Sequence, residues 1–317
     1  MARDTGAQLA VTGRRPHSQG EWVQALANRQ APGMWPPRLI WGTPVISGPV
    51  AAITFDVWHT LIYLSPSDED RYLDLQLESL AAVLRDSPRS SREGQAETCQ
   101  PEQAVLQTFL KASQDVGRGR SLEDLAREAA GRAGREPAPE RWVDACERLV
   151  ARQPFQVVPG ALSQLERVRE GGYRTAVVSN LLGETGRSMW SVLQKLGLDR
   201  YLEARAFSDE LPWAKPAPEI FWTAIRPLAT DPRDAIHIGD LPNDVLGARA
   251  AGFRLAARFE GARAYGRLYA ALCHPDEPIL PPPERVLASW EELPGLLTEI
   301  FPEIAPTEGG PEPPAVG

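Results

Sequence analysis

Short β-rich runs alternate with helical stretches through the second half of this chain, and this alternation constrains the fold more than any other feature of the sequence. The helical stretches lie near residues 162–170, 184–196, 218–225 and 244–251. Such alternation is typical of right-handed β-α-β units, so it predicts an α/β fold with a doubly wound, Rossmann-like parallel sheet covered on both faces. The strand candidates are, in order, 51–55, 175–178, 204–207, 235–238, 255–257 and 286–287.

The region between the first strand and the others has a different pattern. From 64 to 155 apolar residues recur with helical spacing, as in Tyr72, Leu73, Leu77 and Leu80, and no strand pattern is evident. One helix is expected to begin at Ser121, with Asp124 as its capping partner, and another at residues 139–140. The sequence therefore predicts an all-helical domain inserted into the α/β domain.

These patterns give a four-part organisation. Residues 1–50 mix Gly, Pro, Gln and Arg without a sustained period, so we expect a partly disordered N-terminal arm. The α/β core is expected to comprise 51–63 and 156–300, with the helical insertion at 64–155. Residues 301–317 are rich in Pro, Gly and Glu, which indicates a disordered tail.

Composition limits the possible partners and the compartment. The 317 residues carry 34 basic and 42 acidic side chains, and the net charge of -8 disfavours nucleic acid or an anionic membrane as a partner. No apolar run approaches the roughly 20 residues that a membrane helix needs. The start lacks a signal-peptide core, and the three cysteines show no metal-ligand spacing. We expect a cytoplasmic protein and make no prediction about its oligomeric state.

Polar residues follow three of the predicted strands, and a lysine lies on a nearby loop. Because the carboxyl ends of parallel strands meet at one edge of a sheet, these residues are expected to converge. Phosphoryl transfer requires such a set: a nucleophile, hydrogen-bond donors for the transferring oxygens, and positive charge. The residues are Asp56 after the first strand, Ser179 and Asn180 at the end of the second, Asp240 and Asp244 after the fourth, and Lys215 on the loop 208–216.

The two acidic strand ends point to a metal. Asp56 and Asp240 would repel each other unless a cation lay between them, and a hard divalent ion such as Mg²⁺ suits carboxylate, carbonyl and water oxygens. Each residue also has an ordinary structural interpretation, because Asp240 and Asp244 could cap the helix that follows and Ser179 could belong to a turn. His237, in the middle of a strand, is expected to be a core or sheet-face residue.

Four ordered motifs resemble those of the haloacid dehalogenase superfamily, in the form with a helical cap inserted after the first motif. The likeness covers roughly 51–297. It rests on the Asp56 loop, the Ser179 strand end, the Lys215-Pro216-x-Pro218-x-Ile220-Phe221 segment, and Gly239-Asp240-x-x-x-Asp244-Val245-x-Gly247-Ala248.

The resemblance implies a role for each matched residue. Asp56 would attack a small phosphorylated substrate and form an aspartyl-phosphate, Ser179 and Asn180 would bind the transferring group, and Lys215 would hold Asp56 and the phosphoryl oxygens. The implied Mg²⁺ site consists of Asp56, Asp240, the backbone carbonyl of Trp58 and, in support, Asp244. The helical insertion becomes the cap that closes over the substrate.

Trp58 departs from the phosphatase pattern. Phosphatases of this superfamily have a second aspartate two residues after the nucleophile, which acts as general acid and base, and an indole N–H cannot exchange protons in that way. The resemblance thus implies a Mg²⁺-dependent phosphatase that is slow, with two alternatives: a weak or inactive protein that binds phosphorylated ligands, and a 2-haloacid dehalogenase. His59, one residue further on, is a candidate substitute acid or base.

Overall fold

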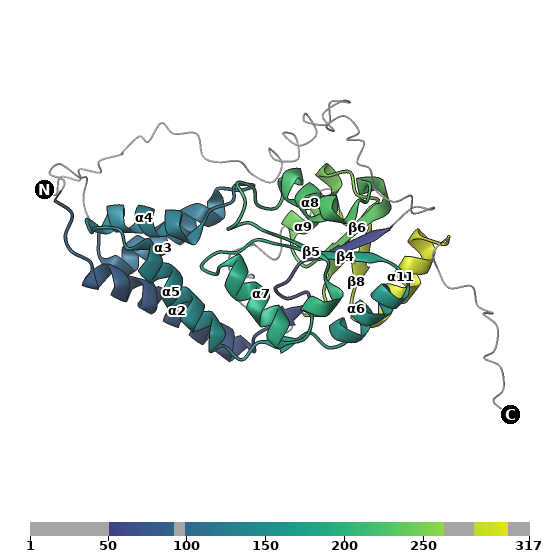
Figure 1. The fold of residues 1–317 in the computed structure, drawn as a ribbon, viewed down its shortest axis with the longest axis horizontal. Coiled ribbons are helices and arrows are strands. Elements are labelled where there is room, and N and C mark those ends of the chain that lie inside the picture. Colours follow the sequence, from purple (N-terminus) through teal and green to yellow (C-terminus); the bar gives the residue numbers. More distant parts are fainter. Residues whose placement is uncertain (1–50, 92–98, 263–281, 304–317) are drawn as a thin grey trace, which may run out of the picture.

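A six-stranded parallel sheet forms the centre of the molecule, and a helical block lies at one end of it (Figure 1). The computed structural model describes residues 51–91, 99–262 and 282–303. The strand order is β5-β4-β1-β6-β7-β8, and every neighbouring pair is parallel. This confirms the predicted α/β class. The strands are β1 (Ala52–Phe55), β4 (Arg174–Ser179), β5 (Ala204–Phe207), β6 (Ala235–Gly239), β7 (Leu255–Phe259) and β8 (Arg285–Leu287).

Helices cover both faces of the sheet, and the two faces carry side chains of different size. Ile53 and Phe55 of β1 pack in a core with α6, α7 and α11, whereas Ala52 lies in a second core with α8 and α9. Neighbouring strands also present alanines to α8 and α9, including Ala176 and Ala206. Small side chains let helices approach the sheet closely. The helices are α6 (Ala161–Glu170), α7 (Gly186–Lys195), α8 (Pro218–Ile225), α9 (Pro242–Ala250) and α11 (Leu293–Ile300).

The helical block between β1 and β4 has its own apolar core. Ser65 and Ser121 cap two of its helices, and each hydroxyl accepts a hydrogen bond from the backbone N–H three residues later. Trp142 is fully buried in the middle of the block. The four helices are α2 (Pro66–Asp86), α3 (Pro101–Gln114), α4 (Leu122–Ala133) and α5 (Pro139–Ala151).

Two of the connections between the helical block and the α/β domain are backbone pairings. The first is a two-residue antiparallel pair, β2 (Ile62–Tyr63) with β3 (Gln156–Val157), which the sequence did not predict because two residues are too few to show alternation. In the second, the loop between α3 and α4 pairs with the loop that precedes Lys215. There the Gly119 N–H donates to Pro212 O at 3.1 Å, and the Ala214 N–H donates to Gly117 O at 3.0 Å. A Cβ atom on Gly119 would lie 1.9 Å from Leu211 O, so this contact requires glycine.

Two predictions concern the ends of the chain. The expected N-terminal arm, 1–50, lies outside the described residues, as do 304–317 of the expected tail. Phe301, the first residue of that tail, is buried and its ring packs against Tyr173. Among the described residues, no helix combines the length and the apolar character that crossing a membrane requires.

Candidate active site

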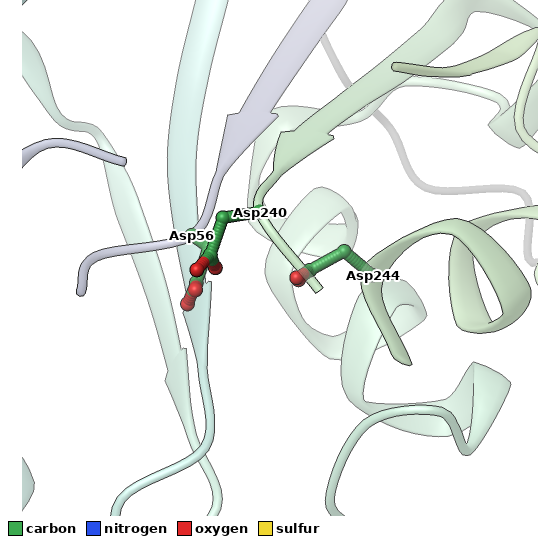
Figure 2. A group of neighbouring side chains, drawn as sticks. All are labelled: Asp56, Asp240 and Asp244. Carbon is green, nitrogen blue, oxygen red and sulfur yellow. The ribbon is translucent and has the colours of Figure 1, made fainter. Parts of the chain in front are cut away.

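Three strand ends bring the predicted residues to one edge of the sheet. In β1, Phe55 pairs with Val177 of β4 on one side and with Ile238 of β6 on the other, so residues just beyond these positions lie together. The backbone N–H of Asp56 donates to Ile238 O at 2.9 Å, which fixes the start of the loop. Figure 2 shows the carboxylates of Asp56, Asp240 and Asp244 gathered around a common space. Residues 184 positions apart in the chain thus become neighbours, as predicted.

Lys215 joins two of these carboxylates. Its ammonium nitrogen lies 2.7 Å from Asp56 Oδ1 and 2.6 Å from Asp244 Oδ1, and its side chain is buried. Asn180 holds the lysine backbone in place, because its Oδ1 accepts from the Lys215 N–H at 2.7 Å and its Nδ2 donates to Lys215 O at 3.0 Å. The structure therefore gives Asn180 a positioning contact that the sequence did not reveal.

Asp244 is held on all sides. Besides Lys215, its Oδ1 lies 2.9 Å from His237 Nε2, and its Oδ2 accepts from the Leu241 N–H at 2.9 Å. His237 Nδ1 in turn lies 2.8 Å from the Thr54 hydroxyl. His237 is a fully buried strand residue, and its contact with Asp244 gives it a role in the site that position along the strand could not indicate.

Charge around the site is unevenly compensated. Burial alone would raise the pKa of the Asp244 carboxyl, but Lys215 and His237 outweigh that effect and hold it well below its usual range. Burial likewise opposes the charged form of Lys215, yet Asp244 and Asp56 raise its pKa. The Asp240 carboxyl has its pKa raised well above the usual value by burial and by the charges of Asp56 and Asp244. Positive charge is therefore in deficit near Asp240.

The donor set suits a divalent cation. Asp56, Asp240 and Asp244 each offer a carboxylate oxygen, and these oxygens lie within 4.8 Å of one another. Three carboxylates around one ammonium group leave a negative surplus, and hard oxygen ligands are those that Mg²⁺ prefers. Because both oxygens of Asp244 already accept hydrogen bonds, Asp56 and Asp240 are better placed to be direct ligands.

Ser179 is the last residue of β4 and lies beside the Asp56 strand at the same edge. Its side chain is buried, and its carbonyl accepts from the Ser208 N–H at 3.1 Å. Pairing of Ser179 with Phe207 in β5 fixes its place in the sheet. The residue thus lies where the sequence predicted, close to the Lys215–Asn180 pair.

Trp58 turns toward the helical block. Its ring stacks on Tyr72 of α2 with centroids 6.2 Å apart and meets Phe155 edge-on at 5.2 Å. His59 is buried with φ of 54°, its Nδ1 3.8 Å from Asp240 Oδ2 and its Nε2 3.4 Å from Glu69 Oε2. An aromatic contact between domains therefore occupies the position of the acid-base aspartate.

A cavity of about 260 Å³ opens beside Trp58 and Asn180, between α2, α3 and the loop after β4. Glu184 lies at its edge and is buried; its Oε1 accepts from the Tyr72 hydroxyl at 2.9 Å and its Oε2 from the Leu182 N–H at 3.1 Å. Burial raises the pKa of Glu184 to about 7. Sequence reasoning missed Glu184, because its partner Tyr72 is 112 residues away in the chain.

The fold and the arrangement of the site are those of a known family. The model of haloacid dehalogenase-like hydrolases matches residues 50–252. The chain therefore belongs to the haloacid dehalogenase-like hydrolase family, which confirms the resemblance seen in the sequence.

Individual relatives are more distant. The chain is 33% identical over 102 residues to phosphoglycolate phosphatase 1 of Pseudomonas aeruginosa, covering 32% of this chain and 36% of the relative. It is 26% identical over 211 residues to glyceraldehyde 3-phosphate phosphatase of Methanopyrus kandleri, covering 64% and 81%. Among solved structures, the 2-haloacid dehalogenase of Pseudomonas syringae pv. tomato superposes with a TM-score of 0.52 at 19% identity, covering 79% of this chain and 99% of that one. That last likeness concerns the fold alone.

Proposed function

We propose that this protein is a Mg²⁺-dependent phosphatase that hydrolyses a small phosphorylated metabolite through an aspartyl-phosphate on Asp56. The observation that carries the proposal is the contact between a strand-end carboxylate and a buried ammonium group, 2.7 Å between Asp56 Oδ1 and Lys215 Nζ. Two curated relatives named as phosphatases of small phosphorylated compounds support the same reaction class.

In the first step an Asp56 carboxylate oxygen attacks phosphorus while the bond from phosphorus to the leaving oxygen breaks. Lys215 offsets negative charge on the transferring oxygens and keeps Asp56 oriented, and Ser179 donates to one of those oxygens. The leaving oxygen takes its proton from solvent, since the indole of Trp58 cannot supply one. Water then attacks phosphorus and gives up a proton to solvent, the bond from phosphorus to Asp56 breaks, and the carboxylate is restored as phosphate departs.

The proposed metal ligands are Asp56, Asp240 and the backbone carbonyl of Trp58, with Asp244 in support through Lys215. When bound, Mg²⁺ would polarise the phosphoryl oxygens and offset the charge that develops on them. Asp244, which itself contacts His237, holds the Lys215 ammonium group beside Asp56. The helical block, as the cap, would cover the substrate and exclude water during transfer.

Phosphate release from a generic aryl phosphate, with Mg²⁺ and with chelator, tests the proposal. Wild-type protein should release phosphate only with Mg²⁺, and Asp56→Asn should lose at least about 10³ of the rate because no covalent intermediate can form. Equal rates in the two proteins would overturn the proposal. A circular dichroism spectrum like that of the wild type verifies that the fold of Asp56→Asn is intact.

Trp58 favours a second candidate, a weakly active or inactive protein that binds phosphorylated ligands. Its sign would be an absence of turnover on a broad panel of phosphate esters while beryllium fluoride still raises the melting temperature. The dehalogenase alternative predicts chloride release from 2-chloropropionate without metal, and the carboxylate cluster around Asp56 argues against it, since a halide leaves without a cation.

A further inference from the structure

The cavity beside Trp58 has a lining that restricts what can enter it. Most of its wall is apolar, formed by Leu73 and Leu77 of α2 and by Leu106, Phe109 and Leu110 of α3. Leu106 and Leu110 are 48% and 41% exposed, and they are two of the four large apolar side chains that the described part of the chain leaves exposed. Apolar side chains gathered at the mouth of a cavity mark a binding site.

The charged residues of the lining have one sign. Glu69, Asp74 and Glu184 contribute to it, whereas Lys, Arg and His are absent from its described lining. A carboxylate or second phosphate placed there would leave water without gaining a cationic partner, and it would be repelled by the acidic groups. The cavity thus disfavours an anionic occupant.

Three buried polar side chains of the lining are hydrogen-bonded to one another. The Tyr72 hydroxyl donates to Glu184, and Gln76 Nε2 lies 3.2 Å from that hydroxyl and 3.0 Å from Gly183 O, to which it donates. These side chains therefore need no polar group from a ligand. Because these three side chains bond to one another, an occupant of the cavity would be recognised mainly by the leucines and aromatic rings of the lining.

Two residues next to the proposed catalytic residues also line the cavity. Trp58 lines it two residues after Asp56, and Asn180, which positions Lys215, lines it as well. A phosphoryl group held at the strand ends would thus have its ester oxygen and the remainder of the substrate directed toward the helical block. We infer, resting on the proposed phosphatase function, that this cavity receives the leaving group of the substrate, and that this group is an apolar alcohol carrying no negative charge.

This class differs from the substrates that the names of the two phosphatase relatives imply. The leaving group of phosphoglycolate carries a carboxylate. The leaving group of glyceraldehyde 3-phosphate is small and polar. Their matched segments do not extend the same substrate to this chain, because the described lining of its cavity holds no cationic side chain and is mostly apolar. The geometry points to an aromatic or branched alkyl ester.

Steady-state phosphate release from benzyl phosphate, ethyl phosphate and phosphoglycolate tests the inference. All three are alkyl esters, so differences reflect the cavity more than intrinsic leaving ability. Wild-type kcat/KM should be higher for benzyl phosphate than for phosphoglycolate by about 10- to 200-fold, the range over which apolar pockets discriminate. A preference for phosphoglycolate would overturn the inference while leaving the phosphatase function intact. Absence of Asp56-dependent turnover on all three would overturn both.

A charge placed on the wall sharpens the test. Leu110→Arg adds a cation at an exposed position of the cavity, so kcat/KM for benzyl phosphate should fall about tenfold and that for phosphoglycolate should rise. Val286→Arg, at a 47% exposed apolar position on β8, is the matched control and should leave both values unchanged. Identical behaviour of the two variants would overturn the assignment of this cavity to the leaving group.

Discussion

Two buried carboxyl groups flank the site, and their surroundings differ. Asp244, on the α/β side, contacts Lys215 and His237, and its pKa is held well below the usual range despite burial. Glu184 lies on the side of the helical block, and no basic group among the described residues lowers its pKa. Burial raises that pKa to about 7. One side of the site is built from compensated charges, while the other has no basic partner for its buried carboxyl group.

This difference separates two roles within one site, the chemical reaction and the choice of leaving group. In the proposed mechanism, opposed charges close together hold the Asp56 nucleophile and the Lys215 cation ready for phosphoryl transfer, whatever the remainder of the substrate is. An apolar wall with paired polar groups does no chemistry but discriminates among leaving groups. The two sides meet at Trp58, which follows the nucleophile in sequence and packs on Tyr72 of the helical block.

Removing the central ammonium group should give the largest effect. In Lys215→Met, Asp56 and Asp244 are left buried without their cation, so the free energy of unfolding should fall by about 3 to 5 kcal/mol and phosphate release should fall by at least about 10³. Denaturant titration and phosphatase assays measure the two effects. Lys195→Met, at an exposed lysine on α7, is the control and should change neither. A loss of stability no larger than in that control would mean that the charges are not coupled as the distances indicate.

The buried carboxyl group of Glu184 predicts that the stability of the protein falls as pH rises. The pKa of Glu184 in the folded protein, about 7, lies above its ordinary value of 4.5. The folded protein therefore retains a proton that the unfolded chain releases, and stability falls as pH rises between these values. Relative to Glu184→Gln, the wild type should lose about 2 to 3 kcal/mol of unfolding free energy between pH 5 and pH 8.

Urea titrations at several pH values measure that difference. Glu78→Gln, at an exposed position of α2, is the matched control and should follow the wild-type pH dependence. If Glu184→Gln shows the same pH dependence as the wild type, the pKa of Glu184 is not raised by burial, and the contrast with Asp244 does not hold.

Restoring the missing acid gives the third prediction. Trp58→Asp should raise kcat with Mg²⁺ by about 10- to 100-fold, below the full range for general acid-base catalysis because the packing on Tyr72 and Phe155 is lost. The side chain introduced by Trp58→Asn has nearly the same shape as the one introduced by Trp58→Asp but has no exchangeable carboxyl proton. The ratio of kcat between the two variants therefore isolates proton transfer. Equal kcat values in the two variants would mean that another group donates the proton. A kcat below that of the wild type in both variants, with the fold intact, would mean that Trp58 itself promotes the reaction.

Much of the site could be predicted because its residues follow strands. A carboxylate directly after a buried parallel strand must lie at one edge of the sheet, so Asp56, Asp240 and the nearby Asp244 were expected to meet, and the structure places them together. The Ser121 cap was also predictable, since capping depends on residues three apart. Glu184 and Tyr72 carry no comparable signal, because neither lies in a local pattern that depends on the other.

The sequence itself determined the order of strands and helices along the chain and the inserted helical block, through periodicity. It also indicated the candidate reacting groups, through polar residues at fixed offsets from apolar runs. Tertiary structure alone decided that Asn180 positions Lys215, that His237 contacts Asp244, and that Trp58 faces an apolar cavity. The physical reason is range: backbone geometry acts over a few residues, whereas burial and charge compensation depend on which distant side chains the packed domains bring together.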